Sequence, residues 1–284
     1  MSCPFCGAEP LELAFLYEEP PAGETRFGLS PEEYRREYLR CPRCGHYLAR
    51  LAIPVERIYT GAYVDATYDS AAGLERTYRR IMELPPERSD NLQRVARIVG
   101  RLGTSGRLLD VGSGLGVFPA RMSERGWQVT ALDPDARAGE HARSVVGVEA
   151  VCADFLEADG LGRFDLVTLN KVLEHVPDPV AMLARARDFV NPDGTVYVEV
   201  PDGEGAAADP DGPGREEFFI EHLHVFSERS LRLLAERAGF EVAVAERLRE
   251  PSGKYTLVAF LAPSSATGRR RASSAAATSW REMS

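Results

Sequence analysis

A stretch of nine residues, Leu108–Gly116, constrains the fold of this chain more than any other. It reads Leu-Leu-Asp-Val-Gly-Ser-Gly-Leu-Gly, which predicts a short buried strand, a glycine-rich turn and the start of a helix. The glycines at alternate positions permit positive φ and let the backbone pass close to a ligand. The first N–H groups of the helix add unpaired donors. The stretch therefore predicts a ligand site where a buried strand ends.

The carboxylate of Asp110 separates two kinds of ligand for this site. Dinucleotide sites hold a pyrophosphate on the helix N-terminus with the spacing G-x-G-x-x-G. Here the third glycine comes one residue early, and Val117 stands where the last glycine of that fingerprint belongs. A carboxylate at the strand end repels a pyrophosphate but suits a cationic or amine-bearing ligand. We therefore favour a ligand of the second kind.

The composition of the chain limits the kinds of partner that we expect for it. Its 284 residues suffice for one substantial domain and a smaller unit. The formal net charge of −9 argues against a large nucleic-acid surface, so we do not expect nucleic acid as a partner. No apolar run approaches the ~20 residues of a membrane span, and Met1–Pro4 lacks the features of a signal peptide. We expect a cytoplasmic protein without a membrane partner.

Four of the five cysteines form two C-P-x-C-G pairs, and we expect them to bind a metal. In a reducing compartment such pairs bind metal more often than they form disulfides. Cys3, Cys6, Cys41 and Cys44 would supply four thiolates to a tetrahedral structural Zn²⁺. Residues 1–50 would then form a zinc-ribbon-like module whose folding energy comes from the metal. The fifth cysteine, Cys152, stands in an apolar strand and is expected in the core.

Two alternatives remain open for this module. His46 can replace one cysteine as a ligand, or the two pairs can be redox-active or coincidental.

Between the pairs, Ser30-Pro31-Glu32-Glu33 has the pattern of an N-cap, a proline at the first helical position and acids in the first turn. We expect a short helix from there to about Tyr38.

The next segment, residues 51–103, is expected to be a helical connector and lid. Tyr59, Tyr63 and Tyr68 precede a helix predicted over about 71–84, and Ser89 caps a second helix that ends at a glycine. The tyrosines either cover the ligand site or pack between two domains.

At the other end of the chain, residues 263–284 have few apolar side chains and are expected to be a disordered tail.

Strands and helices alternate from 104 to 262, which predicts an α/β domain. This alternation gives a mostly parallel sheet with helices on both faces, and the last two strands form a hairpin. The expected strands are 107–111, 128–132, 148–152, 164–169, 195–200, 240–247 and 254–261, with a turn at 191–194. In an open sheet of this kind the ligand lies outside the carboxyl ends of the strands.

The form D-x-G-x-G-x-G, followed by this order of elements, resembles the class I S-adenosylmethionine-dependent methyltransferases. The resemblance implies a Rossmann-like, seven-stranded, mostly parallel sheet with a C-terminal antiparallel hairpin, and methyl transfer from S-adenosylmethionine. Asp110 would bind the amino-acid part of the cofactor, Asp133 the ribose hydroxyls and Asp154 the adenine amine. The other implied cofactor-binding residues are Gly112, Ser113, Gly114, Gly116, Pro134, Phe155 and Asn170. Taken singly, Asp133 can instead cap a helix and Asp154 a turn.

One histidine-bearing stretch follows the fourth expected strand. Leu173–Pro179 reads L-E-H-V-P-D-P, which is frequent in a branch of this family that includes ubiquinone-biosynthesis O-methyltransferases. Some members use acids and a histidine here with a divalent cation, but Asn170 and Lys171 stand where further acids belong. We therefore expect no catalytic metal. His175 is a candidate catalytic residue, and the alternative is that it shapes the pocket or holds the cofactor.

A second stretch lies between the fifth strand and the next helix. Glu221–Ser227 reads E-H-L-H-V-F-S and is similar to the E-H-L-x-x-F-S segment of methyltransferases that act on small molecules and sugars. In an extended segment His222 and His224 point the same way, and one of them is the expected general base. The alternative is that these histidines fix the shape of the loop.

Three functions remain in view. The leading one is methylation of a small molecule, sugar or natural product at oxygen or nitrogen, with carbon not excluded, and a zinc module that is structural or docks the acceptor. The second is a methyltransferase for rRNA or protein whose zinc module grips a macromolecule. The acidic charge and the absence of an N-P-P-Y motif after the fourth strand argue against it. The third is a non-catalytic cofactor-binding protein.

Overall fold

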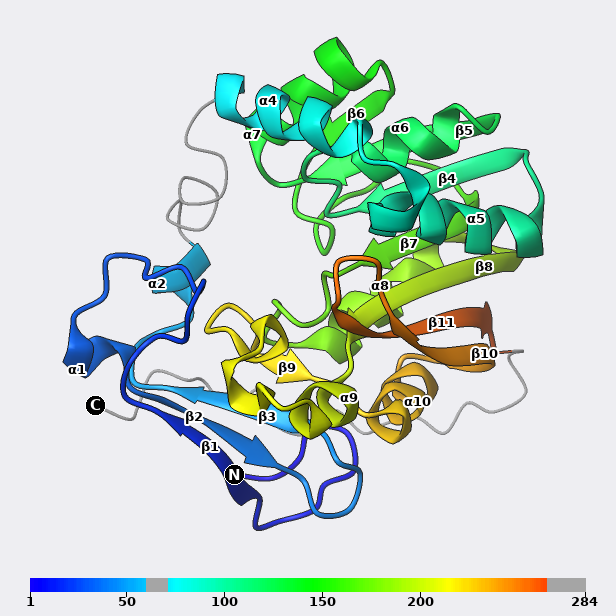
Figure 1. Cartoon of the computed structure of the whole chain (residues 1–284). Coiled ribbons are helices and arrows are strands. Elements are labelled where there is room, and N and C mark those ends of the chain that lie inside the picture. The colour runs from blue at the N-terminus through cyan, green and yellow to red at the C-terminus, as the bar shows by residue number, and fades with distance from the viewer. Residues whose placement is uncertain (60–70, 265–284) are drawn as a thin grey trace.

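A computed structural model describes residues 1–59 and 71–264 (Figure 1). Its larger sheet has the strand order β10-β11-β8-β7-β4-β5-β6. The strands are β4 (Gly106–Val111), β5 (Trp127–Asp133), β6 (Glu149–Cys152), β7 (Phe164–Asn170), β8 (Val190–Pro201), β10 (Phe240–Arg249) and β11 (Tyr255–Pro263). Neighbours pair in parallel except β11, which runs antiparallel to both β8 and β10. The predicted seven-stranded α/β fold with a C-terminal hairpin is confirmed.

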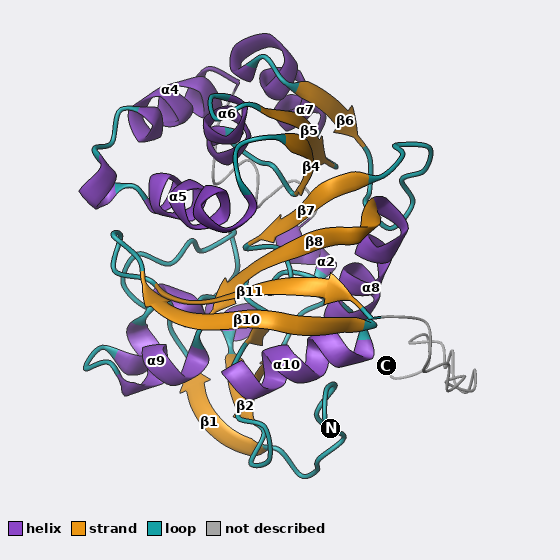
Figure 2. Ribbon diagram, turned by 90° about the vertical axis from the view of Figure 1, so that its right-hand side faces the viewer, coloured by secondary structure: helices purple, strands orange, loops and turns teal. Residues whose placement is uncertain are grey.

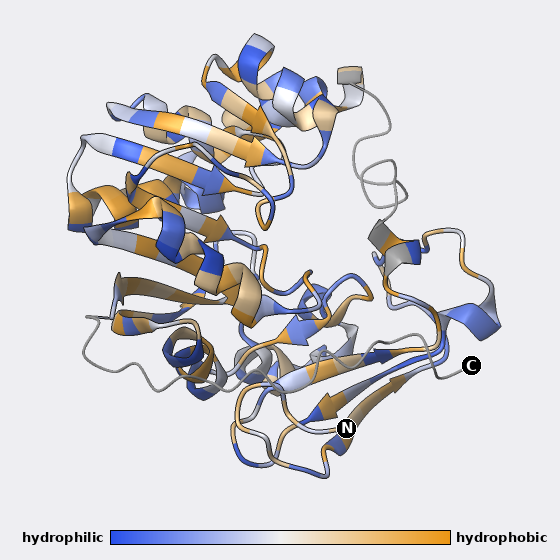
Figure 3. Cartoon of the chain, turned by 180° about the vertical axis from the view of Figure 1, so that it is seen from behind, coloured by the Kyte–Doolittle hydropathy of each residue, from blue (hydrophilic) through white to orange (hydrophobic). Residues whose placement is uncertain are grey.

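Helices cover both faces of this sheet (Figure 2). Leu108 of β4 packs in a cluster with α5 (Asp90–Leu102) and α6 (Val117–Ser123). The next residue, Leu109, belongs to the opposite cluster, with α8 (Pro179–Phe189) and α10 (Glu228–Arg237). A parallel strand buried on both faces must be apolar throughout rather than alternating. In Figure 3 hydrophobic residues run along much of the strands, and hydrophilic and hydrophobic residues both occur along the helices.

Capping residues set several of the predicted helix starts. The Ser89 hydroxyl accepts from the N–H of Leu92 at the start of α5. Asp178 caps α8, and Ser227 caps α10. Each cap satisfies an N–H that has no partner within the helix, and the helix predicted after Ser89 begins where we expected it.

The first fifty residues form more than the two cysteine loops, because they also contribute three strands to a second sheet. Its order is β1-β2-β3-β9. The strands are β1 (Glu12–Tyr17), β2 (Arg36–Arg40), β3 (Tyr47–Leu51) and β9 (His224–Val225). The last of these comes from the loop between β8 and α10, so a strand from the second half of the chain completes the N-terminal sheet (Figure 1).

The helix predicted from Ser30 to about Tyr38 is wrong in its length. Ser30 caps α1 as expected, but α1 covers only Pro31–Tyr34. The chain then extends into β2 because Arg36 is buried against the carboxylate of Glu24, with Arg36 Nη2 at 2.6 Å from Glu24 Oε1. Tyr38 is fully buried in the core of this sheet. Tertiary packing thus overrides the local helix signal.

Two smaller expectations are also corrected. Cys152 is exposed rather than buried, because β6 is the edge strand of the larger sheet and ends at this residue. The turn expected at 191–194 is an irregularity within β8, where the register to β7 shifts between Phe164 and Leu166.

Short helices complete the described chain. They are α2 (Glu56–Tyr59), α4 (Ala71–Met82), α7 (Ala136–His141), α9 (Gly203–Ala208), η1 (Pro86–Arg88), η2 (Ala142–Val146), η3 (Gly212–Gly214) and η4 (Glu216–Phe218). Within the described residues no helix has the length and apolarity needed to cross a bilayer. Tyr63, Tyr68 and the predicted tail beyond residue 264 lie outside the described residues.

Candidate active site

The loops that follow four adjacent parallel strands surround a cavity of about 670 Å³, here called the large cavity. It lies at the carboxyl ends of β4, β5, β6 and β7, where an open α/β sheet binds its ligand. The predicted cofactor residues that line it are Gly112, Ser113, Gly114, Asp133, Pro134, Asp154 and Phe155. His175 lines it as well. Three predicted residues, Asp110, Gly116 and Asn170, do not line it.

The glycine turn after β4 requires its glycines for two different reasons. Gly112, Gly114 and Gly116 all have positive φ, at 69°, 49° and 70°. A Cβ on Gly112 would lie 2.8 Å from Cγ2 of Val172 in the loop after β7, too close for a carbon contact. A Cβ on Gly116 would meet Val146 at 2.7 Å. Gly116 therefore shapes the start of α6 rather than the cavity wall.

Asp133 ends β5 and links two loops of the cavity. Its Oδ2 accepts the N–H of Gly114 at 2.9 Å, and its Oδ1 accepts the N–H of Asp135 at 2.9 Å. Burial raises the pKa of this carboxyl. Each oxygen has a second acceptor position, so the carboxylate can still accept bonds from a ligand.

Asp110 lies under the glycine turn. Its side chain is buried, and Oδ1 accepts from Thr168 Oγ1 at 2.6 Å and from Asn170 Nδ2 at 3.0 Å. Burial raises its pKa to about 6, against the opposing effect of these two donors. Asp110 and Asn170 thus form one network that ties β4 to β7 below the cavity.

Asp154 and Phe155 follow β6. The Phe155 ring is buried and packs against Phe189, with ring centroids 5.3 Å apart. The Asp154 carboxylate is exposed and accepts the N–H of Leu156 at 2.8 Å. Asp154 therefore both closes a turn and faces the large cavity.

A second cavity of about 210 Å³, here called the small cavity, adjoins the first and shares Lys171 and His175 with it. Its other lining residues are Glu174, Pro201, Glu216, Glu217, Phe219, Glu221, His222, Lys254 and Tyr255. Apart from Pro201 at the end of β8, these come from three segments, namely the loop after β7, the segment before β9 and the C-terminal hairpin.

Backbone carbonyls fix the tautomers of two histidines at this cavity. His175 Nδ1 lies 3.0 Å from the carbonyl of Glu221, and His222 Nδ1 lies 2.9 Å from that of Glu217. A carbonyl oxygen only accepts, so each Nδ1 carries the proton. Burial lowers the pKa of His175 to about 4 and that of His222 well below its usual range. Both rings are therefore neutral, with Nε2 as the basic nitrogen.

His224 does not share the orientation of His222, so that expectation is wrong. Its Nδ1 lies 3.0 Å from Nε2 of His46, and the ring faces the cysteine unit next to Phe5. It lines neither cavity. The pairing of β9 with β3 holds this residue against the N-terminal sheet, which removes it from reach of the site.

Lys171 and Glu174 line the site, although the sequence analysis did not predict either of them as a site residue. Lys171 has φ of 58°, and its Nζ donates to Oγ1 of Thr256 on β11 at 2.6 Å. Glu174 is fully buried, and burial raises its pKa to about 7, with Lys171 opposing the rise. Only the pairing of β8 with β11 brings Thr256 to this loop, so local sequence carries no signal for the contact.

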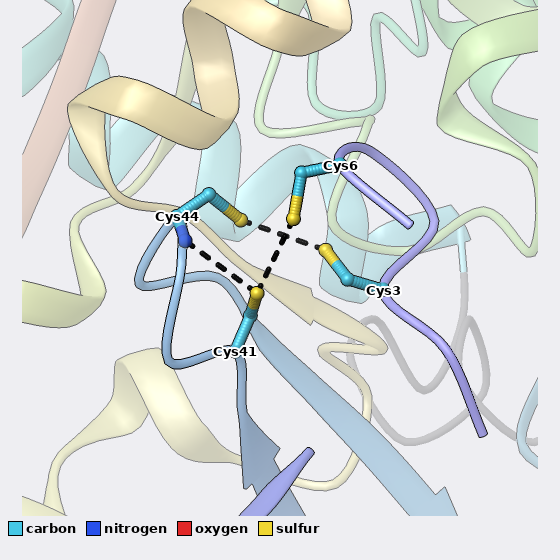
Figure 4. Close-up of side chains that lie close together, drawn as sticks. All are labelled: Cys3, Cys6, Cys41 and Cys44. Carbon is cyan, nitrogen blue, oxygen red and sulfur yellow. Dashed lines mark hydrogen bonds between the residues drawn. The ribbon is translucent and has the colours of Figure 1, made fainter. Parts of the chain in front are cut away.

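The four paired cysteines converge on one point (Figure 4). Cys3 Sγ lies 3.5 Å from Cys44 Sγ, and Cys6 Sγ lies 3.4 Å from Cys41 Sγ. All four sulfurs lie within 4.8 Å of one another. Tetrahedral Zn–S bonds of about 2.3 Å place sulfurs at about 3.8 Å, so this cluster fits such an ion after a small expansion. His46 is not part of the cluster.

A family model described as a methyltransferase domain matches residues 78–244, which is more than half of the chain. This protein belongs to that family of methyltransferase domains. The match begins after the cysteine unit, so the family relation concerns the larger sheet and its cavity.

Curated relatives match over a shorter segment. The ubiquinone biosynthesis O-methyltransferase of Pseudomonas paraeruginosa is 36% identical over 131 residues, which cover 43% of this chain and 56% of the relative. The protein of the same name from Aromatoleum aromaticum is 32% identical over 127 residues, covering 42% and 52%. The match thus spans about half the length of these relatives.

Solved structures share the fold. The 1,6-didemethyltoxoflavin-N1-methyltransferase of Burkholderia thailandensis, with bound S-adenosylhomocysteine, has a TM-score of 0.53 and 24% identity, and covers 80% of this chain and 99% of its own. The magnesium protoporphyrin IX methyltransferase of Synechocystis has a TM-score of 0.53 and 17% identity, with coverages of 72% and 100%. At these identities the likeness concerns the fold alone.

Proposed function

We propose that this protein transfers a methyl group from S-adenosylmethionine to a small-molecule acceptor, at oxygen or nitrogen in preference to carbon. The observation that carries the proposal is the junction of the two cavities at His175 and Lys171. A cofactor-sized space at the strand ends adjoins a smaller space that is lined by two neutral imidazoles. Membership in the methyltransferase domain family supports the cofactor, and relatives named for ubiquinone biosynthesis support a small acceptor.

The chain's own residues would hold the cofactor in the large cavity. The Gly112–Gly114 turn admits its amino-acid part, and Asp133 accepts from the ribose hydroxyls. Asp154 and Phe155 take the adenine, through a hydrogen bond to the amine and contact with the ring. Asp110 and Asn170 support the turn from below. The cofactor supplies a methyl group already activated on a sulfonium, so positioning and exclusion of water are the main tasks of the protein.

His222 is the proposed general base. The attacking oxygen or nitrogen forms a bond to the methyl carbon, and the methyl–sulfur bond breaks with its electron pair going to sulfur. The acceptor proton passes to Nε2 of His222, whose Nδ1–H stays bonded to the carbonyl of Glu217. His175 is the second candidate, because its ring lies 4.9 Å from that of His222.

Zinc at the four cysteines is part of this proposal, in a structural role. The Ser227 hydroxyl donates to the carbonyl of Cys44, and Arg237 Nη1 donates to that of Pro4 at 2.7 Å. These bonds join the cysteine loops to α10. A metal that fixes the loops therefore also fixes the segment that carries His222.

Isothermal titration with S-adenosylhomocysteine and a methyl-transfer assay over a panel of small acceptors test the function. We expect His222→Ala to keep its affinity for S-adenosylhomocysteine within about 3-fold and to lose about 100-fold or more in kcat. His224→Ala is the matched control and should keep a larger share of kcat. Loss of less than a few-fold in His222→Ala would overturn the base assignment. Failure of the wild type to bind S-adenosylhomocysteine would overturn the function itself.

A further inference from the structure

We propose that the small cavity is an acceptor subsite for a compact ring that carries neighbouring hydroxyl or amino groups, and that Glu174 binds one of these donors directly. The inference rests on the proposed function and names the chemical class of its acceptor. A volume of about 210 Å³ corresponds to about seven waters of ~30 Å³, which is the space of a single substituted ring.

Most charged groups of the small cavity already have partners. Glu217 accepts from Arg215 at 3.0 and 3.1 Å, and from the N–H of Tyr255. Glu216 lies 3.3 Å from Lys254 Nζ. Lys171 donates to Thr256. These pairs line the cavity, and each of these charged groups has at least one partner within the protein.

Glu174 differs from these groups. Its side chain is fully buried, and neither carboxylate oxygen has a hydrogen-bond partner in the part of the chain that the structure describes. Its backbone carbonyl, by contrast, is well used and accepts the N–H of Leu223 at 2.7 Å. A buried carboxylate without donors is costly, and proteins keep such a group where a ligand completes it.

The neighbouring His222 adds a second acceptor. One ring nitrogen of His175, one of His222 and a carboxylate oxygen of Glu174 all lie within 4.8 Å of one another. His222 Nδ1 is bonded to a carbonyl, so its Nε2 presents a lone pair. A molecule that fills this space must therefore bring at least two donors. A hydroxyl or amine next to the methylated atom meets that requirement, whereas an apolar or anionic group leaves Glu174 unpaired.

The same three residues have the composition of a divalent-cation site, which is the competing interpretation. Lys171 lines the same cavity and places a fixed positive charge beside Glu174. A second cation would be opposed by that charge, while a neutral hydroxyl would not. The charge therefore favours an organic donor.

Ligand-observed NMR with ring-sized probes tests the proposal, with and without saturating S-adenosylhomocysteine. The probes are cis- and trans-cyclohexane-1,2-diol, which are neutral and carry two donors, and cyclohexanone and cyclohexanecarboxylate, which carry none at neutral pH. We expect saturation transfer to the first two and at least 10-fold weaker binding of the others. Equal binding of all four probes, or preference for the carboxylate, would overturn the proposal without any variant.

Variants then assign the effect to one side chain. Glu174→Gln should weaken the binding of the diols by about 10-fold or more and leave the affinity for S-adenosylhomocysteine within about 2-fold. Glu241→Gln, at an exposed position of β10, is the matched control and should behave as wild type. Glu174→Leu serves where Gln fails to fold. Unchanged probe affinity in a folded variant would overturn the role of Glu174.

Three further outcomes distinguish this inference from the divalent-cation interpretation and from the proposed function. Metal analysis that finds a second bound ion, lost in Glu174→Gln, would replace the organic donor by a cation. Tight binding of S-adenosylhomocysteine together with no binding of any probe would overturn the acceptor class and leave the proposed function standing. No binding of S-adenosylhomocysteine, with the donor probes still bound, would overturn the proposed function and leave the subsite.

Discussion

The large cavity takes most of its lining from loops that follow four adjacent strands of one sheet, whereas the small cavity draws on three segments that lie far apart in sequence. The loops of the large cavity are held by hydrogen bonds to one another; for example, Asp133 accepts the N–H of Gly114. The second rests on the N-terminal sheet, where Tyr38 of β2 donates to the carbonyl of Phe219 at 3.1 Å and Ala49 of β3 donates to that of Leu223 at 2.9 Å.

This difference indicates that the two cavities depend on different parts of the chain. The large-cavity side, proposed to hold the cofactor, is a property of the larger sheet, and the small-cavity side, proposed to hold the acceptor, is a joint property of both sheets and the cysteine cluster. Variants that act on one side and spare the other therefore sharpen the comparison, and variants that affect both sides equally would break it.

The largest separation is expected from Cys41→Ser. Loss of one proposed zinc ligand should release the loop of Cys41 and Cys44. The carbonyl of Cys44 accepts from the Ser227 hydroxyl, so the segment that carries His222 should also become less well fixed. Methyl transfer should fall by about 100-fold or more, because small misplacement of a catalytic group has effects of that size. Affinity for S-adenosylhomocysteine should stay within about 3-fold, as measured by titration.

Cys152→Ser is the matched control for this variant, since Cys152 is exposed and lies outside the cysteine cluster. It should retain both methyl transfer and its zinc content. If Cys41→Ser lost cofactor affinity as strongly as turnover, the two sides would not be separable.

A smaller effect, on the opposite side, is expected from Gly112→Ala. Its φ of 69° and the 2.8 Å approach to Val172 combine backbone strain with a clash. The variant should lose about 1–3 kcal/mol of stability and about 10-fold in affinity for S-adenosylhomocysteine. Gly147 also has positive φ, but a Cβ there would meet no atom within 4 Å. The variant Gly147→Ala therefore measures the effect of backbone strain without a clash. Equal losses in both variants would show that the contact with Val172 is unimportant.

Glu174→Leu should change the pH dependence of stability. The pKa of Glu174 is raised to about 7 from its usual 4.5, so its contribution to stability is fully present below pH 4.5 and is lost as pH rises through 7. Lys171, Glu199 and Lys254 act on this carboxyl in the fold, and His175 and His222 lie beside it.

Removing the carboxyl should therefore raise stability at pH 8 by about 1–3 kcal/mol and have little effect at pH 5. Urea unfolding of the wild type and the variant at both pH values measures the difference. A stability gain that is equal at the two values would mean that Glu174 does not titrate in this range.

The smallest effect is expected from Asp154→Asn. The carboxylate is exposed, and its bond to Leu156 survives in the amide. Affinity for S-adenosylhomocysteine should fall by about 3-fold, since an exposed charged hydrogen bond contributes little. The acceptor KM should not change. A loss of 100-fold would mean that this loop closes over the cofactor.

Sequence patterns predicted the two sides unequally, and the reason is physical. The D-x-G-x-G-x-G stretch and the acids at strand ends are local signals, because parallel strands bring their carboxyl ends to one edge. The alternation of strands and helices and the helix cap at Ser89 are equally local patterns.

Long-range contacts explain what the sequence did not predict. The pairing of β3 with β9 separates His224 from His222 and completes the N-terminal sheet with a distant strand. The buried ion pair of Arg36 with Glu24 replaces a predicted helical turn by β2. Lys171 reaches Thr256 across β8 and β11. None of these contacts has a spacing that a single sequence can signal.

Native mass spectrometry of the freshly purified protein, repeated after denaturation, tests the central claim most directly. We predict a native mass excess equal to one zinc ion plus S-adenosylmethionine or S-adenosylhomocysteine, added where it does not co-purify, and loss of both on denaturation. Paired cysteines without zinc would contradict the account of the cysteine cluster. A protein that binds neither form of the cofactor would contradict the assignment of the large cavity, and with it the proposed methyl transfer.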